Sequence, residues 1–309
     1  MTVPPPPLPT SENLGTHAGV SLKPDHYEQV LEEGNDGQMG EGPKWFEVHM
    51  ENYMGDGGLP HYYLDRIGKK FPLSFHGVGL SLGSGGGLDR THLDKIKTLV
   101  DRYNPSLVSE HVAWSIADDR QNKIFHNDLL PVPYTHAALD VLVDNINEMQ
   151  DHIGRKILIE NPSTYLTFRN GDFDEADFIL EALKRTGAGL LLDVNNVYVS
   201  ASNHGWDGEA YLNKIPADVI GEVHMAGHHV RDYNGKTIRI DDHGSHVTTD
   251  VWGLFEDLIK RVGPKPTLIE WDTDVPTFDV LKTEAALAQI ILDAYRKCED
   301  FHLMGARHG

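Results

Sequence analysis

The sequence of 309 residues contains a single cysteine, Cys298, and this scarcity removes several classes of protein. One thiol cannot form an internal disulfide, a thiolate-rich zinc site or a cysteine-ligated iron–sulfur cluster. Cys298 ends an amphipathic stretch that begins at Leu281. We therefore expect a buried structural thiol rather than a reactive one.

Long hydrophobic runs and a secretion signal are missing too. No apolar run approaches the roughly 18 residues that a membrane-spanning helix requires. Residues 1–10 are rich in proline and lack the basic region and apolar core of a signal peptide. The sequence predicts a soluble, cytoplasmic protein with a proline-rich tail over residues 1–17 and one domain over residues 18–309.

Positive charge is also scarce. Lys and Arg number 27 against 47 Asp and Glu, which gives a formal net charge of -20. Such a surface repels phosphate backbones and anionic lipids. We therefore expect neither nucleic acid nor a membrane as a partner, and we favour a small molecule or a short peptide.

Several catalytic signatures are absent. The chain has no Gly-x-Ser-x-Gly elbow and no His-Glu-x-x-His helix, which argues against serine hydrolases and zincins. The glycine-rich run over residues 83–87 lacks the Gly-Lys-Ser/Thr ending of a P-loop and the spacing of a dinucleotide fingerprint. A close backbone approach or a flexible lid is the better interpretation of these glycines.

What the chain does contain is a regular alternation of apolar, strand-like runs with amphipathic helical stretches. The expected strands are Ala18–Leu22, Trp45–Val48, Leu73–His76, Leu107–His111, Ile157–Glu160, Gly189–Asp193, Val219–His224 and Thr267–Glu270. The clearest helical patterns are Asp89–Tyr103, Thr135–Ile153, Asp174–Thr186 and Thr249–Val262. Eight such units predict an α/β fold, a (β/α)8 TIM barrel in a single domain, with its active site at the C-terminal strand ends.

Two insertions are expected to enlarge the loops on that face. Trp114–Pro133 is a long excursion, and Val230–Ile240 has the pattern of a hairpin built on Asn234-Gly235. A further loop, Glu32–Pro43, is rich in glycine and acidic residues.

Histidines and carboxylates stand at or just past the ends of the apolar runs. They are His76, His111, Glu160, Asp193, His224, His228, His229, Asp241, His243, Glu270 and Asp272. Because the C-terminal ends of parallel barrel strands meet on one face, this pattern indicates a multinuclear metal site at the mouth of the barrel.

The carboxylates give the strongest part of this argument. Glu160, Asp193 and Glu270 each follow apolar residues, and an unpaired buried carboxylate costs several kcal/mol. Basic residues are rare at the other strand ends, so metal ions are favoured as the neutralising charges. In an extended segment, Asp241 and His243 would point to one side and could share an ion.

Seven short motifs, taken together, carry a resemblance to a known family. They are residues 51–53 (Glu-Asn-Tyr), 109–111 (Ser-Glu-His), 160–163 (Glu-Asn-Pro-Ser), 193–200, 224–228, 241–244 (Asp-Asp-His-Gly) and 270–272 (Glu-Trp-Asp). In these the chain resembles the multinuclear non-heme iron-dependent oxidases, TIM-barrel enzymes that modify peptides in natural-product pathways, methanobactin biosynthesis among them. The resemblance spans about Gly19 to Asp272 and departs from the family in longer loops at Glu32–Pro43 and Trp114–Pro133.

The resemblance implies a set of metal ligands. They are His76, His111, Glu160, Asp193, Asn196, His224, Asp241, His243 and Glu270. It implies His76 and His111 on one iron, Glu160 bridging to a second iron held by Asp193, His224 and Glu270, and a third, weaker site at Asn196, Asp241 and His243. Residues expected to support the ligands or to contact substrate are Glu51, Asn52, Glu110, Asn161 and His228.

The implied chemistry is the oxidation, by molecular oxygen, of a cysteine in a ribosomally made precursor peptide. Two to three irons, as mixed Fe(II) and Fe(III), are the implied cofactor. Glu160 would couple two irons, and Asp272 is a candidate proton acceptor, although a hydrogen bond to a ligand histidine is an equally good role for it. The product stays open between an oxazolone with a thioamide, a residue that has lost its β-carbon, and another rearrangement.

A partner is implied as well. A small companion protein that grips the leader of the precursor peptide would form a heterodimer with this chain, at Trp114–Pro133 or Val230–Ile240. Three rival functions remain. An apurinic endonuclease needs a basic groove, which the charge of -20 disfavours. A sugar isomerase needs a lysine or histidine base, and metal storage does not require nine ligands on separate strands.

Overall fold

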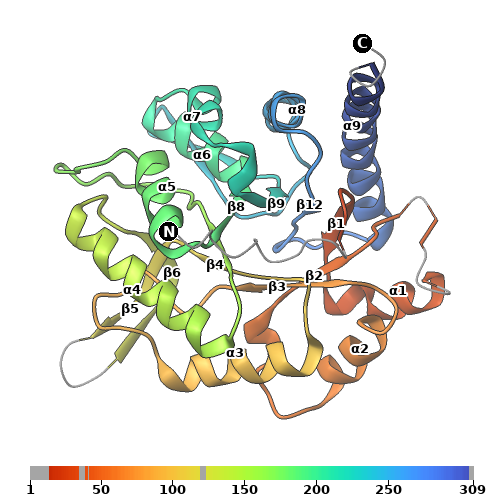
Figure 1. Ribbon diagram of the computed structural model, residues 1–309, viewed down its shortest axis with the longest axis horizontal. Helices are drawn as coiled ribbons and strands as arrows, with labels where there is room; N and C mark the ends of the chain where they lie inside the picture. The colour runs from red at the N-terminus through yellow and green to blue at the C-terminus, as the bar shows by residue number, and fades with distance from the viewer. Residues whose placement is uncertain (1–13, 35–38, 41, 119–122, 306–309) are drawn as a thin grey trace.

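Eight parallel strands close into a barrel at the centre of the molecule in this computed structural model (Figure 1), which describes residues 14–34, 39–40, 42–118 and 123–305. In chain order the barrel strands are β1 Ala18–Ser21, β2 Phe46–His49, β3 Leu73–Gly77, β4 Leu107–His111, β7 Leu158–Glu160, β8 Gly189–Asp193, β9 Ile220–Met225 and β12 Thr267–Ile269. Each end differs from the expected segment by at most one residue. The predicted TIM barrel is confirmed.

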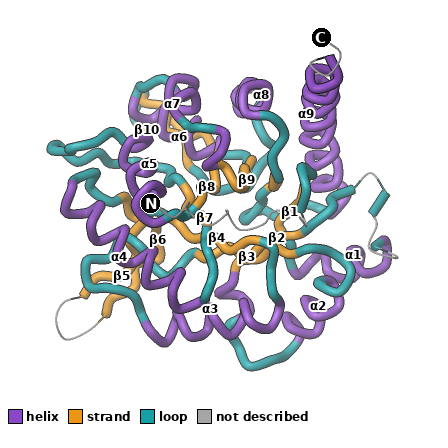
Figure 2. The backbone as a smooth tube through the Cα atoms, in the orientation of Figure 1, coloured by secondary structure: helices purple, strands orange, loops and turns teal. Residues whose placement is uncertain are grey.

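Helices surround the barrel and cover its strands (Figures 1 and 2). They are α1 Tyr27–Glu33, α2 Leu59–Ile67, α3 Arg90–Tyr103, α4 His136–Ile153, α5 Glu175–Thr186, α6 Val194–His204, α7 Gly208–Lys214, α8 Thr249–Val262 and α9 Phe278–Gly305. Short 3-10 turns lie at Pro24–His26, Met50–Tyr53 and Ala217–Val219.

Local capping sets where these helices begin and end. The side chains of Asp89, Thr135 and Asp174 accept backbone N–H groups in the first turns of α3, α4 and α5, which satisfies donors that the helix itself leaves unpaired. Gly154 and Gly187 follow α4 and α5 with φ of 75° and 66°, a conformation that glycine adopts without strain. The boundaries expected from the sequence follow from these same residues.

The inside of the barrel changes from apolar to polar along its axis. Alternate residues of each strand point inward. Toward the N-terminal ends of the strands, a buried apolar cluster forms a plug. Its residues are Leu14, Trp45, Leu107, Leu158, Leu191 and Leu268. The next positions along three strands are Glu160, Asp193 and Glu270, at the C-terminal end. The alternation of the strands thus places carboxylates above a closed hydrophobic floor.

Two antiparallel hairpins extend beyond the barrel. The first, β5 Ala113–Asp118 with β6 Lys123–Pro131, occupies the segment expected to be a long excursion, for which the sequence analysis named no strands. Alternating β-branched and aromatic residues such as Ile116 and Phe125 pair across it. The second, β10 His229–Tyr233 with β11 Lys236–Ile240, turns at Asn234 and Gly235 with φ of 55° and 78°, as the sequence predicts.

Some expectations fall outside the described part of the chain. Residues 1–13 of the proline-rich tail, part of the loop Glu32–Pro43 and the side chain of Cys298 are among them. Within the described residues, no helix is both long enough and apolar enough to cross a membrane.

Candidate metal centre

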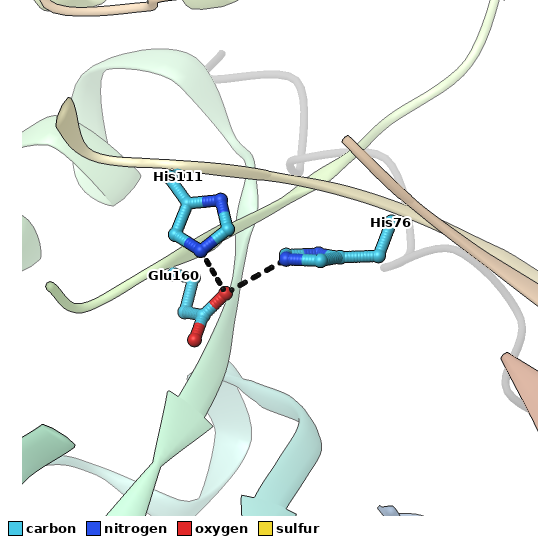
Figure 3. A group of neighbouring side chains, drawn as sticks. All are labelled: His76, His111 and Glu160. Carbon is cyan, nitrogen blue, oxygen red and sulfur yellow. Dashed lines mark ion pairs between the residues drawn. The ribbon is translucent and has the colours of Figure 1, made fainter. Parts of the chain in front are cut away.

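Glu160, at the end of β7, lies between two histidines from neighbouring strands (Figure 3). Its Oε2 atom is 3.1 Å from Nε2 of His76 on β3 and 3.2 Å from Nε2 of His111 on β4. Ser109 Oγ lies 2.7 Å from Nδ1 of His76, and the carbonyl of Gly77 lies 3.0 Å from Nδ1 of His111. Each ring is therefore held at one nitrogen while the other points at Glu160.

A second group continues from the same carboxylate across the barrel. Glu160, Asp193 and His224 bring donor atoms within 4.8 Å of one another, and all three side chains are buried. His224 Nδ1 also lies 3.0 Å from Glu270 Oε2. Glu160 thus belongs to both groups, the arrangement that a bridging carboxylate requires.

The third group is built from the loop after β11. His243 Nε2 lies 2.7 Å from Asp241 Oδ1, and His243 Nδ1 lies 3.3 Å from Glu270 Oε2. The two residues face each other, but not because the segment is extended: His243 has φ of 46°, in the left-handed region that a non-glycine residue rarely adopts. Asn196, in the first turn of α6, lines a cavity that Asp241 and His243 also line.

Buried polar atoms without hydrogen-bond partners test whether these groups fit a metal. Within the described residues Asp193 Oδ2 and Asn196 Oδ1 have no partner, whereas Glu160 Oε2, His224 Nε2 and His243 Nε2 have only ion-pair contacts. A buried polar atom without a partner is costly, and natural proteins contain few of them. Neutral imidazole and carboxylate donors that converge in this way fit divalent transition-metal ions.

Without metal, charge pairing dominates the site. Burial alone would lower the pKa of His111, but Glu160 and Glu110 raise it to about 10. Burial alone would raise the pKa of Glu160, but His111 and His76 lower it to about 2. Burial and the nearby Glu160 raise the pKa of Asp193 well above its ordinary value. Burial and a neighbouring carboxylate thus disfavour the ionised form of Asp193, and a bound cation would offset both effects.

The supporting residues expected from the sequence differ in what they contact. Asn161 exchanges two hydrogen bonds with the backbone of Asp193, at 2.8 and 2.9 Å. Glu110 accepts the backbone N–H of His111 at 3.0 Å, and His228 Nδ1 lies 2.8 Å from Asn195 Oδ1, whose amide nitrogen donates to Asp241 at 2.7 Å. Asn161, Glu110 and His228 therefore support candidate ligands, His228 through Asn195.

The other two supporting residues lie at the 3-10 turn after β2. Glu51 accepts the backbone N–H groups of Val78 and Gly79 at 3.0 and 2.9 Å, and so orders the loop after β3. Asn52 is exposed and takes no part in the contacts described above.

Asp272 is held from two sides. Its Oδ2 lies 3.1 Å from Nδ1 of His243, and its Oδ1 lies 2.6 Å from Nζ of Lys23. His49, which the sequence analysis overlooked, reaches Glu270 at 3.3 Å and Asp272 at 3.7 Å. His49 directly follows the expected strand Trp45–Val48, and His76 ends the expected strand Leu73–His76. The same pattern of a histidine at a strand end could therefore have identified His49.

A second overlooked group lies deeper in the barrel. His224 Nε2 is 3.4 Å from Glu47 Oε1 and 3.6 Å from Glu222 Oε1, and Ser74 Oγ donates to both carboxylates at 2.9 and 3.2 Å. Burial and Glu47 raise the pKa of Glu222 to about 8. A carboxylate in the middle of an otherwise apolar strand was the available sequence signal. These acids orient His224 from below.

A cavity of about 610 Å³ opens above the candidate metal groups. The candidate ligands that reach it are His111, Asn196, Asp241, His243 and Glu270. The cavity is also lined by Phe125, His126, Asp128 and Leu129 of β6 and by Tyr165, whose hydroxyl accepts the backbone N–H of Asp241 at 2.8 Å. The site is therefore open to a ligand of the size of several residues of a peptide.

Comparisons with known proteins give a family match. Residues 17–293 match the model described as "RiPP precursor modification enzyme MbnB/TglH/ChrH". A protein named UPF0276 from Paraburkholderia phytofirmans is 47% identical over 275 residues, covering 88% of this chain and 86% of its own length. A UPF0276 protein from Caulobacter sp. is 51% identical over 267 residues, covering 86% and 93%.

Solved structures share the fold at low identity. L-ribulose 3-epimerase has a TM-score of 0.56 at 15% identity, covering 94% of this chain and 99% of its own. D-psicose 3-epimerase, solved with D-fructose, has a TM-score of 0.55 at 13% identity, covering 89% and 99%. At such identities the likeness shows the barrel fold and carries nothing about the substrate.

Proposed function

Because this chain belongs to the MbnB/TglH/ChrH family of RiPP precursor modification enzymes, we propose that it oxidises a cysteine residue of a ribosomally made precursor peptide, using molecular oxygen at a centre of two to three irons. The family match supplies the class of substrate. The cysteine, the iron and the oxygen are the parts of the proposal that go beyond it.

The observation that carries the proposal is the shared oxygen of Glu160. Two histidines approach this one atom at 3.1 and 3.2 Å, and the same residue belongs to the group formed with Asp193 and His224. A carboxylate that serves two ions lets their charges and redox states influence each other. A multi-step oxidation benefits from this coupling, because more than one electron leaves the substrate.

The donor types suit iron. Imidazole and carboxylate ligands hold Fe(II) and Fe(III), and the described ligand groups contain no thiolate. In our proposal His76 and His111 hold one iron with Glu160, and Asp193, His224 and Glu270 hold the second. Asn196, Asp241 and His243 form the third site. Bound iron would supply the capacity to bind the substrate sulfur and to activate oxygen.

The residues of the chain orient this centre and limit its access to water. The leucine plug closes the barrel below, and Glu47 and Glu222 fix the orientation of His224. The β5–β6 hairpin places Phe125 and Leu129 at the edge of the cavity, where apolar side chains exclude water from a bound peptide. Asp272 either accepts a proton from the substrate or orients His243, and its contacts with Lys23 and His243 support the second role.

A companion protein is the second part of the proposal. The barrel and its hairpins account for nearly all of the described chain, and no separate unit remains to hold a leader peptide. Both hairpins present exposed apolar side chains: Ile124 and Phe125 on β6, and Val230 and Tyr233 on β10. They are our candidate contact surfaces for a small leader-binding protein that forms a heterodimer with this chain.

Oxygen uptake by the iron-loaded protein tests the proposal against its rivals. We expect consumption of oxygen on addition of a cysteine-containing precursor peptide encoded next to this gene, together with the neighbouring candidate companion. The same peptide with serine in place of cysteine is the control. Uptake that does not depend on the cysteine would contradict the proposal, and conversion of ketohexoses without oxygen would favour a sugar isomerase instead.

A further inference from the structure

A second cavity, of about 570 Å³, lies beside the metal cavity and shares a wall with it. Residues of the segment 162–168 line both sides of that wall. Pro162, Ser163 and Tyr165 face the metal cavity, whereas Thr164, Leu166, Thr167 and Phe168 face the second one. Because only this loop segment separates the two cavities, a peptide that lies across it can reach both cavities at once.

Five aromatic side chains are part of the lining of the second cavity. They are Tyr134, Phe168, Phe173, Trp206 and Tyr211. Trp206 and Tyr211 stack with their ring centroids 5.4 Å apart. Aromatic faces are electron-rich, so a cavity of this kind favours a cation on an apolar stem over a neutral polar group.

A carboxyl group completes the cavity. Glu175, in the first turn of α5, accepts a hydrogen bond from the Tyr134 hydroxyl at 2.6 Å. Tyr211 brings a second, buried hydroxyl toward the same carboxyl group. Tyr211 itself is only 7% exposed. A largely buried carboxyl group with two hydroxyl oxygens beside it offers several acceptors to a ligand that donates hydrogen bonds.

The charged residues that line the cavity also favour a cation. Asp174, Glu175 and Asp207 stand against one lysine, Lys214, and that lysine is already paired with Asp174 and with Asp177. Asp207 caps α7 by accepting the N–H groups of Glu209 and Ala210. The cavity therefore has unneutralised negative charge, within a chain whose net charge is -20.

We propose that this second cavity binds the side chain of an arginine or lysine that lies close in sequence to the reacting cysteine of the peptide. The apolar stem would pack against the aromatic rings, and the charged end would meet Glu175 and the Tyr211 hydroxyl. Because a single loop segment separates the two cavities, the basic residue would lie close in sequence to the cysteine. The peptide as its source rests on the function proposed above, whereas binding of the cation itself does not.

The ionisation of Glu175 gives the binding a pH dependence. Burial raises the pKa of Glu175 to about 7, Tyr134 and Tyr211 lower it, and Asp174 raises it. The other charged or titratable groups lining the cavity are His204, Asp207 and Lys214. A cation binds the ionised carboxylate, so affinity should rise as the pH increases from 6 to 8, across the pKa of about 7.

Calorimetry with the metal-loaded protein and short capped peptides tests the proposal independently of catalysis. The probes are acetyl-Gly-Arg-Gly-amide and the same tripeptide with citrulline, which keeps the shape of arginine but has no charge, or with norleucine, which keeps only the stem. We expect the arginine probe to bind at least about tenfold more tightly than either control, since a charge-assisted hydrogen bond is compared with a neutral one for citrulline and with none for norleucine. Equal binding of all three would overturn the cation site, and preferential binding of norleucine would show an apolar pocket instead.

A pair of variants locates the binding. Glu175→Gln keeps the shape of the side chain and should weaken the arginine probe by about tenfold and remove its pH dependence. Glu181→Gln, on the same helix but away from the cavity, removes an equal charge and should change nothing. Equal effects of the two variants would overturn the assignment to this cavity. A cysteine peptide with a nearby arginine should then show a lower KM than its citrulline version at unchanged kcat, and failure of this last arm alone would place the fault with the proposed function.

Discussion

Lys23, near the start of the chain, holds the carboxylate of Asp272, just after the last barrel strand, with Nζ 2.6 Å from Oδ1. The other oxygen of Asp272 lies 3.1 Å from His243 Nδ1. Burial and Glu270 would raise the pKa of Asp272, but His49 and His243 lower it below its ordinary range. A carboxylate stabilised in this way is a weak proton acceptor and a good partner for a ligand histidine.

Asp272→Asn tests this role. We expect the variant to bind metal at the His243 site about 10–100-fold more weakly, the usual cost of losing a partner of a ligand histidine, while the other sites stay filled. Metal titration followed by elemental analysis measures it. Asp274→Asn, an exposed neighbour, is the control. Full metal content together with a lost pH dependence of turnover would instead identify Asp272 as the proton acceptor.

Glu160→Ala should remove more than one equivalent of metal, because this carboxylate belongs to two groups of donors. His243→Ala should remove about one, since His243 lies at the edge of the cluster. Elemental analysis of iron-replete preparations gives the numbers, and circular dichroism checks the fold of both variants. Loss of a single equivalent from Glu160→Ala would contradict the bridging role.

Metal removal should lower the thermal stability of the protein. In our proposal the buried carboxylates of Glu160 and Glu270 have ions as partners in the loaded state, and in the stripped state they keep only histidines and, for Glu160, the amide of Asn196. We expect the Tm to fall on the order of 5–10 °C with a chelator and to recover when Fe(II) is added anaerobically. An unchanged Tm in a sample shown to have lost its metal would mean that the ions contribute nothing to the folded state.

Glu51 gives a prediction for stability against pH. Burial alone would raise its pKa, but His92 and the N–H groups of Val78 and Gly79 lower it from the ordinary 4.5 to about 2. A carboxylate with a lowered pKa stabilises the fold above pH 4.5, and that stabilisation is lost as the pH falls toward 2. Glu51→Gln should therefore lower the free energy of unfolding at pH 7 by about 1–3 kcal/mol and by much less at pH 3. Urea unfolding at the two pH values measures the difference, and an equal loss at both would rule out the charge as its cause.

The barrel could be predicted because its signals are local. Each strand is a short apolar run, and residues such as Asp89 and Thr135 cap the helices between the runs, so eight units could be read in order. The candidate donors were visible because polar residues at buried strand ends are costly without partners. His76, Glu160 and Asp193 illustrate the pattern.

What the sequence did not reveal depends on contacts between distant segments. Glu47 and Glu222 meet at His224 only because β2 and β9 face each other inside the barrel, at a sequence separation that no motif spans. The left-handed backbone of His243 is set by its surroundings, since Asp272 and Thr273 both donate backbone N–H groups to its carbonyl. The pairing of Lys23 with Asp272 joins the two ends of the barrel in the same way.

In the proposed reaction, this chain oxidises a peptide cysteine with oxygen at a bridged iron centre. The most direct test is mass spectrometry of the precursor peptide after incubation with the iron-loaded protein and its companion, with and without oxygen. We expect a change of mass confined to the cysteine residue, seen only with oxygen and lost in Glu160→Ala. A peptide that stays unmodified with all components present, or that changes equally without oxygen, would contradict it.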